Sequence, residues 1–252
     1  MTIRLYTAWS DATQERAGRS PIRDAAIRAA LLHLLADNTA AIRRPPSDTP
    51  ARRVALIGGF DRGSRAVRAA VKAAATGHGW PLLDLPTVPA FGAIPPADDI
   101  AVVVAANPAV SQAAHRCAAF WRCRVLDPAV DPADLACRER PAVAVTTADG
   151  LCDHSASRWE ISGSLTYRTR TGPATGVTAI AVEPGTDGIV IDRVHGDRHE
   201  RARLGTTSLV LRVDLPTEGT IDGHAQIFPA GTYTFVAQPE RYGHLALPGE
   251  QG

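Results

Sequence analysis

Residues 52–64 have the sequence RRVALIGGFDRGS, and the rest of the architecture can be worked out from this stretch. A short apolar run, 54–57, ends at the glycine pair Gly58 and Gly59, and an Ala/Arg-rich pattern with helical spacing begins at Arg65. This order predicts a strand, a tight turn and the N-terminus of a helix. Such turns are where α/β proteins tend to hold phosphate groups. The stretch is therefore the first candidate for a functional site.

The composition is that of an ordinary globular protein. The chain has 252 residues, of which 45% are hydrophobic and 21% are charged. This length allows one large domain or two modest ones, with enough apolar residues to bury a core. The formal net charge is +1. A protein that binds nucleic acid or anionic membranes in general needs a basic excess, so we expect neither partner.

The sequence predicts no membrane span and a cytoplasmic location. No apolar stretch approaches the ~20 residues that a membrane helix needs. Residues 1–11 lack the basic start and apolar core of a signal peptide. The cysteines are spaced too irregularly for a zinc ribbon or a redox pair, and are interpreted as half-buried thiols in a reducing compartment. They are Cys117, Cys123, Cys137 and Cys152.

The first half of the chain alternates between strand and helix patterns. The run 100–105 is apolar without alternation, which indicates a strand buried on both faces, as in a parallel sheet. The sequence 43–51 is rich in proline and reads as a linker or loop. Strands are expected at 2–9, 54–57, 81–85, 100–105 and 124–126, and helices from Ser20, at 65–75 with Gly77 as C-cap, and at 109–121 after an Asn107-Pro108 cap.

Helical periodicity disappears after Pro141. Turn signals such as Pro184-Gly185 and Asp222-Gly223 separate short strand patterns, which suggests a sandwich or a curled antiparallel sheet. Strands are expected at 142–146, 159–170, 177–182, 188–194, 208–215, 217–221, 225–228 and 232–237. The predicted fold class is an α/β N-terminal domain (1–141) with an open, mostly parallel sheet, followed by an all-β, antiparallel, sandwich-like C-terminal domain (142–252).

The order of strand patterns and turns near the C-terminus resembles that of a known protein superfamily. The strand pattern 209–215 is followed by the Asp222-Gly223 turn, and then by a turn of Pro-Ala-Gly type at 229–231 and a last strand pattern. This order resembles the closing strands of the superfamily that joins NAD kinases and diacylglycerol-type lipid kinases. Hairpins with such turns also occur in other β domains.

Three further stretches are similar to motifs of that superfamily. The run Gly58–Ser64 resembles its Gly-Gly-Asp-Gly-Thr motif, with Phe60 and Arg62 as interruptions. Gly163–Tyr167 resembles the substrate-loop motif of NAD kinases but departs from it in two residues and in the spacing to the next Gly-Pro. Asn107-Pro108 resembles the Asn-Pro that opens the lipid kinases. The Asn-Pro and Gly-Gly matches would align this sequence with the superfamily at different positions, so the two matches cannot both be correct.

The resemblance implies a nucleotide-binding protein that transfers a phosphoryl group from ATP, with Mg²⁺, to a hydroxyl of a dinucleotide or lipid. Asp61 would be the catalytic carboxylate. The implied phosphate- and nucleotide-binding residues are Gly58, Gly59, Gly63 and Ser64, and the implied substrate residues are Gly163, Ser164, Tyr167 and Asp222. A homo-oligomer formed through the β domain is a further expectation.

Simpler interpretations stand beside these roles. The glycine pair could merely allow a sharp turn, with Asp61 or Ser64 capping the next helix. Asp222 could be an ordinary hairpin-turn residue. The chain could then be a relative that has lost catalysis, or an unrelated two-domain binding module. The segment 195–200, with two histidines four residues apart, could contribute to a metal site, but a polar hairpin tip explains it better, so no metal ligands are assigned.

Overall fold

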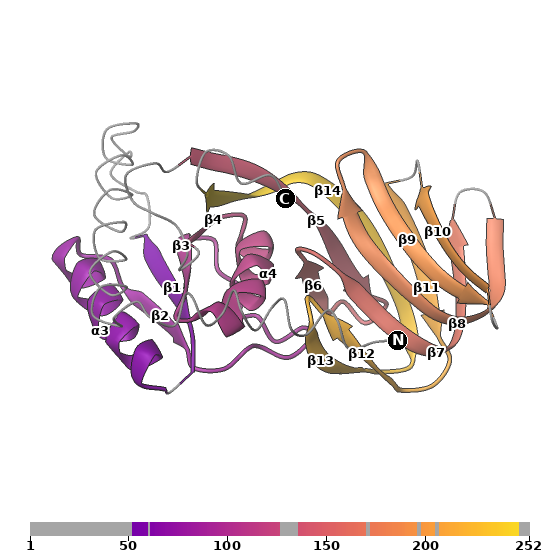
Figure 1. Ribbon diagram of the computed structural model, residues 1–252, viewed down its shortest axis with the longest axis horizontal. Coiled ribbons are helices and arrows are strands. Elements are labelled where there is room, and N and C mark those ends of the chain that lie inside the picture. Colours follow the sequence, from indigo (N-terminus) through magenta and orange to yellow (C-terminus); the bar gives the residue numbers. More distant parts are fainter. Residues whose placement is uncertain are drawn as a thin grey trace, which may run out of the picture.

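The computed structural model describes residues 52–59, 61–126, 136–169, 172–195, 198–204 and 207–246 (Figure 1). The predicted strand 2–9, the helix from Ser20 and the linker 43–51 lie outside these residues. The described elements are β1 (Arg53–Ile57), α3 (Arg62–Gly77), β2 (Leu82–Leu85), β3 (Ile100–Ala105), the 3₁₀ turn η1 (Pro108–Val110), α4 (Ser111–Trp121), β4 (Arg124–Leu126), β5 (Ala136–Thr147), β6 (Cys152–Ser155), β7 (Trp159–Thr169), β8 (Gly172–Gly185), β9 (Gly188–His195), β10 (Arg198–Leu204), β11 (Ser208–Val213), β12 (Thr217–Ile221), β13 (His224–Phe228) and β14 (Gly231–Ala246).

Strands from both halves of the chain form one large mixed sheet, with the main order β10-β9-β8-β7-β11-β14-β4-β3-β1-β2. The strands β2, β1, β3 and β4 are parallel neighbours. The end of β14 joins them in parallel, with Gly243 beside Arg124 and Leu245 beside Leu126. Along its length β14 also pairs antiparallel with β11 and β5. The sheet therefore continues from one half of the chain into the other through β14.

Two helices cover opposite faces of the parallel strands (Figure 1). Successive side chains of a strand point to opposite faces. In β1, Val54 and Leu56 pack in one core cluster with α3, whereas Ala55 and Ile57 pack in another with α4. The same division holds in β3, of which all residues but one are buried. The prediction that the run 100–105 is a strand buried on both faces is confirmed.

The strands after β4 share a core centred on Trp159. Its ring centroid lies 4.6 Å from that of Phe228, 4.7 Å from Phe235 and 5.8 Å from Tyr233. The same cluster contains residues of β5 and β14 as well as residues of β8 and β9. In the sheet, neither β5 nor β14 is a neighbour of β8 or β9. The antiparallel strands therefore curl around a common core, in which Trp159 is fully buried.

A buried ion pair connects α4 with the antiparallel strands. The side chains of Arg116, on α4, and Asp153, on β6, are both fully buried. The Nε of Arg116 donates to Oδ1 of Asp153 at 2.9 Å, and its Nη2 donates to Oδ2. The same guanidinium donates to the carbonyl oxygens of Pro89, at 2.8 Å, and Ala90, at 3.0 Å. The Gly92 amide donates to Asp153. One charge pair thus fixes a helix, a strand and the segment 89–92 against one another.

Several predicted boundaries are wrong. The helix α3 begins at Arg62 and continues through Gly77, and its C-cap is His78, whose amide donates to the carbonyls of the last turn. The helix expected at 109–121 starts as the 3₁₀ turn η1, and the side chain of Asn107 makes no capping hydrogen bond to it. The last strand runs to Ala246 instead of ending at Ala237.

Two strands were not predicted, because their residues are polar. The strand β6 has the sequence CDHS, and three of its four residues are nonetheless buried. Burial is tolerated there because Asp153 is paired with Arg116. The strand β10, RHERARL, forms a hairpin with β9. This pairing places His195 and residues 198–200 in a β-hairpin, while the two residues between its strands lie outside the described part of the chain.

The proposed domain boundary falls between Pro141 and Ala142, which both lie inside β5. The division into two domains therefore remains a prediction, while the strand-rich mixed sheet is established. Within the part of the chain that the structure describes, neither α3 nor α4 has the length and hydrophobicity to cross a membrane.

We expect the variant Asp153→Asn to destabilise the fold by about 3–5 kcal/mol, because it leaves the buried guanidinium of Arg116 without its counter-charge. Equilibrium urea unfolding measures this loss. A matched control is Asp214→Asn, which removes an ion pair with Arg212 whose side chain is 72% exposed, and should change the stability by less than about 1 kcal/mol. Equal losses of stability in the two variants would show that the buried pair stabilises the fold no more than an exposed ion pair does.

Candidate functional site

The glycine loop 58–64 lies at the C-terminal ends of three parallel strands. The Gly58 amide donates to the carbonyl of Leu85, the last residue of β2, at 3.2 Å. The Ala106 amide, just after β3, donates to the carbonyl of Ile57 at 2.6 Å. Gly58 is buried so close to Ala106 that a Cβ added to it would overlap the Cβ of Ala106. Gly58 therefore allows close packing of β1 and β3, whereas Gly59 has room for a Cβ, with Asp61 as its nearest neighbour at 3.5 Å.

Asp61 is the N-cap of α3. Its Oδ1 accepts a hydrogen bond from the Ser64 amide at 2.9 Å, and its Oδ2 accepts one from the Ser64 hydroxyl. These hydrogen bonds, first of all that of the hydroxyl, lower the pKa of Asp61 below its ordinary value. The capping role that sequence reasoning held as the simpler interpretation is present. The carboxylate is also exposed at the surface and ionised, so an approaching ligand would meet its negative charge.

Asn107 joins this group from the end of β3. Its Nδ2 donates to Oγ of Ser64 at 2.8 Å and to Oδ2 of Asp61 at 3.2 Å. Its Oδ1 is buried and has no hydrogen-bond partner. Sequence analysis treated Asn107 as a helix cap or as part of a competing motif match. The signal that could have placed it here is its position directly after a buried parallel strand, because the C-terminal ends of neighbouring parallel strands lie at one edge of the sheet.

A basic side chain supports the loop from α3. The Arg68 guanidinium lies 3.4 Å from the carbonyl oxygens of both Gly58 and Gly59 and pairs with Asp84 of β2 at 2.7 Å. These contacts direct the two carbonyls towards Arg68. The first turn of α3 contains no acidic residue. The helix dipole therefore gives this end of α3 a partial positive charge, which the N-cap Asp61 partly balances by accepting hydrogen bonds from the amides of Ser64 and Gly63.

The second predicted group lies on β7 and makes different contacts. The Ser164 hydroxyl donates to Asp214 at 3.2 Å. A Cβ on Gly163 would lie 3.3 Å from the Thr217 hydroxyl. Tyr167 is only 2% exposed, and its ring belongs to the core around Trp159. These contacts come from residues 214–217 and the antiparallel core. They do not bring the β7 group together with the glycine loop.

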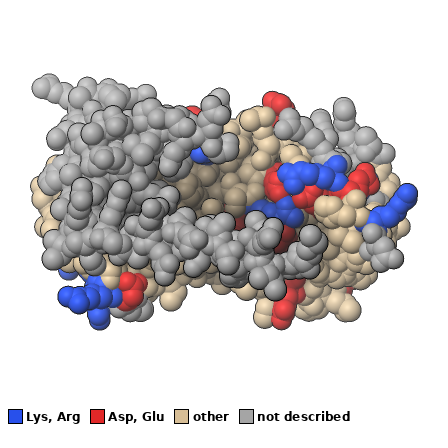
Figure 2. Space-filling model, viewed as in Figure 1, with Lys and Arg blue, Asp and Glu red and all other residues tan. Residues whose placement is uncertain are grey.

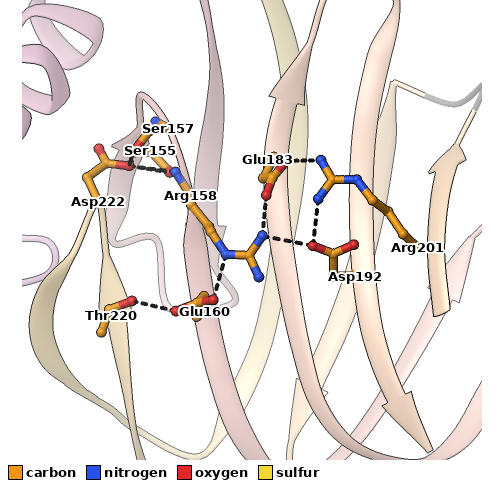
Figure 3. A network of polar contacts seen from close by, with 9 residues as sticks. All are labelled: Ser155, Ser157, Arg158, Glu160, Glu183, Asp192, Arg201, Thr220 and Asp222. Atoms are coloured by element: carbon orange, nitrogen blue, oxygen red, sulfur yellow. Dashed lines mark hydrogen bonds and ion pairs between the residues drawn. The ribbon is translucent and has the colours of Figure 1, made fainter. Parts of the chain in front are cut away.

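Asp222 is a buried anchor for the segment before β7 (Figure 3). It occupies the β12–β13 turn with a φ of +50°. Its Oδ1 accepts hydrogen bonds from the Ser155 hydroxyl, from both the amide and the hydroxyl of Ser157, and from the Arg158 amide, at 2.8–3.0 Å. Its Oδ2 accepts one from the Ala156 amide at 2.8 Å. The carboxylate of Asp222 is therefore occupied by the chain itself.

An ionic network that sequence analysis missed begins at Arg158 (Figure 3). The Arg158 guanidinium contacts the carboxylates of Glu160, Glu183 and Asp192, on β7, β8 and β9. Arg201, on β10, pairs with the last two of these carboxylates. The hydrogen bonds with the carboxylates raise the pKa of Arg158. Figure 2 shows acidic and basic residues interleaved over the β-rich end of the molecule. Each charged group of this network has an oppositely charged partner on another residue of it, although Oδ1 of Asp192 is buried without a described hydrogen-bond partner. The network therefore links neighbouring strands.

The cysteines and histidines do not form a metal centre among the described residues, where no group of three or more metal-binding side chains gathers. Cys117 and Cys123 are buried and Cys152 is exposed. Burial raises the pKa of the Cys117 thiol to about 12, so it stays protonated at neutral pH. Cys137 lies in β5, but its side chain is outside the described part.

A groove of about 890 Å³ lies beside the β12–β13 hairpin. Phe91, Leu151 and Ile227 give it apolar walls, and Gln226 and Glu218 are among its polar residues. Ile227 is 72% exposed. None of the predicted site residues lines the groove, although Ser162, the chain neighbour of Gly163, does.

We expect Gly58→Ala to destabilise the fold and Gly59→Ala to leave it almost unchanged. The first substitution forces a methyl group into the Cβ of Ala106, whereas the second meets no atom closer than 3.5 Å. Thermal melting of the two variants should separate them by several degrees, since overpacking costs about 1–3 kcal/mol. Similar melting temperatures would show that β1 and β3 can move apart freely.

We expect Asp222→Ala to cost more stability than a typical surface substitution, about 2–4 kcal/mol, because it leaves buried donors of residues 155–158 without an acceptor. Asp222→Asn keeps an acceptor oxygen and should cost less. Urea unfolding measures both. A cost below about 0.5 kcal/mol for Asp222→Ala would mean that the turn carboxylate does not anchor this segment.

The chain was compared with protein-family models and with curated protein sequences, and neither comparison gives a match. The relationship to the NAD kinases and lipid kinases is therefore still a hypothesis that rests on the residues of this sequence.

Proposed function

We propose that this chain binds a nucleotide, whose phosphate groups lie at the loop 58–64. The observation that carries the proposal is the position of this loop. It follows β1 at the C-terminal edge of parallel strands and leads into the N-terminus of α3. The positive end of a helix dipole favours anions, although the amides of Gly63 and Ser64 at this end of α3 already donate to Asp61. At Gly59 the described atom nearest to an added Cβ is Oδ2 of Asp61, at 3.5 Å, so among the described residues there is room for a phosphate oxygen to approach the backbone beside that carboxylate.

The proposed family would divide the chain into an α/β part (1–141) and an antiparallel β part (142–252). Two observations support this division. The strands β1 to β4 pair in parallel and are flanked by α3 and α4, while the strands from β5 to β13 pair only in antiparallel fashion. A homo-oligomer through the β part and a cytoplasmic location remain proposals from the sequence.

ATP-dependent phosphoryl transfer to a hydroxyl group is the catalytic form of this proposal. Mg²⁺ prefers oxygen ligands and is commonly held by one or two carboxylates together with the phosphates of the substrate. The exposed Asp61 carboxylate is an oxygen ligand of this kind at the loop, whereas the amide oxygen of Asn107 is buried and its Nδ2 is the atom that faces Asp61. Of the two side chains, Asp61 is therefore the one that fits such an ion. Bound there, Mg²⁺ would neutralise phosphate charge. Asp61 would hold it, and the backbone at Gly59 and Gly63 would position the phosphates.

A binding protein without catalysis is the second candidate. The motif is interrupted by Phe60 and Arg62. Both oxygens of Asp61 already accept hydrogen bonds from Ser64 or Asn107. A carboxylate with a lowered pKa is a weak proton acceptor, so the carboxylate of Asp61 suits a structural or ion-holding role better than that of a general base.

Thermal melting with ATP and Mg²⁺, NAD or ADP-ribose tests nucleotide binding. A ligand that binds only the folded chain adds about 2.7 kcal/mol at a concentration 100 times its Kd, which raises the melting temperature by several degrees. The variant Gly59→Ala should lose this shift while it melts like the parent chain without ligand. If none of the three ligands shifts the melting temperature, the proposed function is wrong and an unrelated binding module is favoured.

The variant Asp61→Asn separates the two candidates. Asparagine is as good an N-cap as aspartate, so the variant should melt within about 1 °C of the parent chain. The loss of the charge should abolish ATP-dependent phosphoryl transfer, measured as ADP release with a dinucleotide or lipid acceptor. Activity that survives this substitution rules out the assigned role of Asp61. A ligand-induced shift in the parent chain with no turnover supports the non-catalytic candidate.

A further inference from the structure

The C-terminal turn of α4 is held by two side chains from other parts of the sheet. Arg241, on β14, donates from Nε to the carbonyl of Ala119 at 2.6 Å and from Nη2 to that of Phe120 at 3.3 Å. A cation at this place stabilises the exposed carbonyls and the negative end of the helix dipole. His154, on β6, packs its ring edge-on against Phe120, with the centroids 5.6 Å apart.

The His154 ring is buried next to one polar side chain. It is 3% exposed, and among the described residues neither Nδ1 nor Nε2 has a partner with the geometry of an ordinary hydrogen bond. The Gln238 side chain of β14 is close enough to raise the pKa of the ring by a hydrogen-bonding contact, although its Oε1 also lacks a described partner of that geometry. A buried polar ring with no partner is rare in folded proteins, and it is tolerated more easily in the neutral form than as a cation.

The charges around the ring favour the neutral form. Arg241 on β14 and Arg122 just after α4 both face His154 with positive charge. Asp153, the neighbouring residue on β6, is the negative group nearby, but its carboxylate is bound by Arg116. The opposite neighbour of His154 in β5 is Ala144, which carries no charge. A proton on the ring would therefore meet two guanidinium groups, one carboxylate that Arg116 already binds, and the Gln238 side chain, whose contact offsets only part of the unfavourable effect.

We propose that His154 is an acid-sensitive latch: when its ring takes up a proton, the C-terminal turn of α4 separates from β6 and β14. The cation formed at His154 repels Arg241, which then leaves the carbonyls of Ala119 and Phe120. The separation gives the ring access to water. The ion pair between Arg116 and Asp153, one turn earlier on α4, keeps the rest of the helix in place. This proposal does not depend on nucleotide binding.

The direction of the pH effect follows from the pKa of His154. Burial, and then the charge of Arg241, lower this pKa from 6.5 to about 4 in the closed state. In the opened state the ring has an ordinary pKa and binds a proton more readily. The closed state therefore has its full stability above pH 6.5, and this stability decreases as the pH falls towards 4. Between pH 8 and pH 5 these two pKa values predict an increase of about 30-fold in the opening equilibrium.

Amide hydrogen exchange on the full chain tests the latch at the turn itself. The amides of Arg122 and Cys123 both donate to the carbonyl of Ala118, so their exchange reports the opening of the last turn. After correction for the intrinsic rate, exchange should be about 30-fold faster at pH 5 than at pH 8 in the parent chain. In the variant His154→Phe it should not change with pH. The matched control His224→Gln removes a half-buried histidine on β13 and should behave like the parent chain.

A second measurement keeps the test decisive if His154→Phe does not fold. The NMR titration of the His154 ring in the parent chain should give a midpoint below about 5, and a midpoint near 6.5 overturns the proposal. Corrected exchange rates that do not change between pH 8 and pH 5 also overturn it. So does an equal acceleration in His154→Phe, since the response would then belong to another group, such as His115 of the same helix.

Discussion

The buried pair of Arg116 and Asp153 determines how the parts of this molecule are placed. Each charge would be costly to bury alone, and together they are saturated by each other and by the backbone of residues 89–92. The pair connects α4, which covers one face of the parallel strands, to β6, which belongs to the antiparallel strands. Apolar contacts alone would allow α4 to slide along the sheet. A bidentate ion pair with further hydrogen bonds allows one position.

That position affects the candidate site. Asn107 lies just ahead of η1 and α4 and contacts Asp61 and Ser64 on the other side of the loop. The loop geometry thus depends on where α4 begins, and Arg116 helps to fix this. Polar side chains also hold two other parts of the chain in place. Arg241 binds the C-terminal turn of α4, and Asp222 binds the segment before β7. Polar groups from distant parts of the sequence fix each of these elements.

The sequence allowed prediction of those features that depend on local pattern. The strand 100–105 and the order of β1, loop and α3 follow from uninterrupted apolar runs and glycine signals, and they are present. The capping of α3 by Asp61 is readable because its partner, Ser64, is three residues away. In contrast, β6 reads as polar, and its burial depends on Arg116, which is 37 residues away. The contact of Asn107 with Asp61 spans 46 residues. No local pattern reports such pairs, so the Arg158 network and the anchoring role of Asp222 could not be found, and only the position of Asn107 after a buried parallel strand pointed to the loop.

The path of β14 has a consequence for the order in which the chain can fold. The strand β4 lies between β3 and the end of β14, and this last neighbour is supplied by residues 243–245. During synthesis, the parallel strands emerge from the ribosome long before their final partner does. Until then the outer edge of β4 is an unpaired template for other chains. A cell that makes this protein therefore has to protect a half-finished sheet while the residues between 126 and 243 are synthesised, and chains that terminate in this interval would be prone to aggregate.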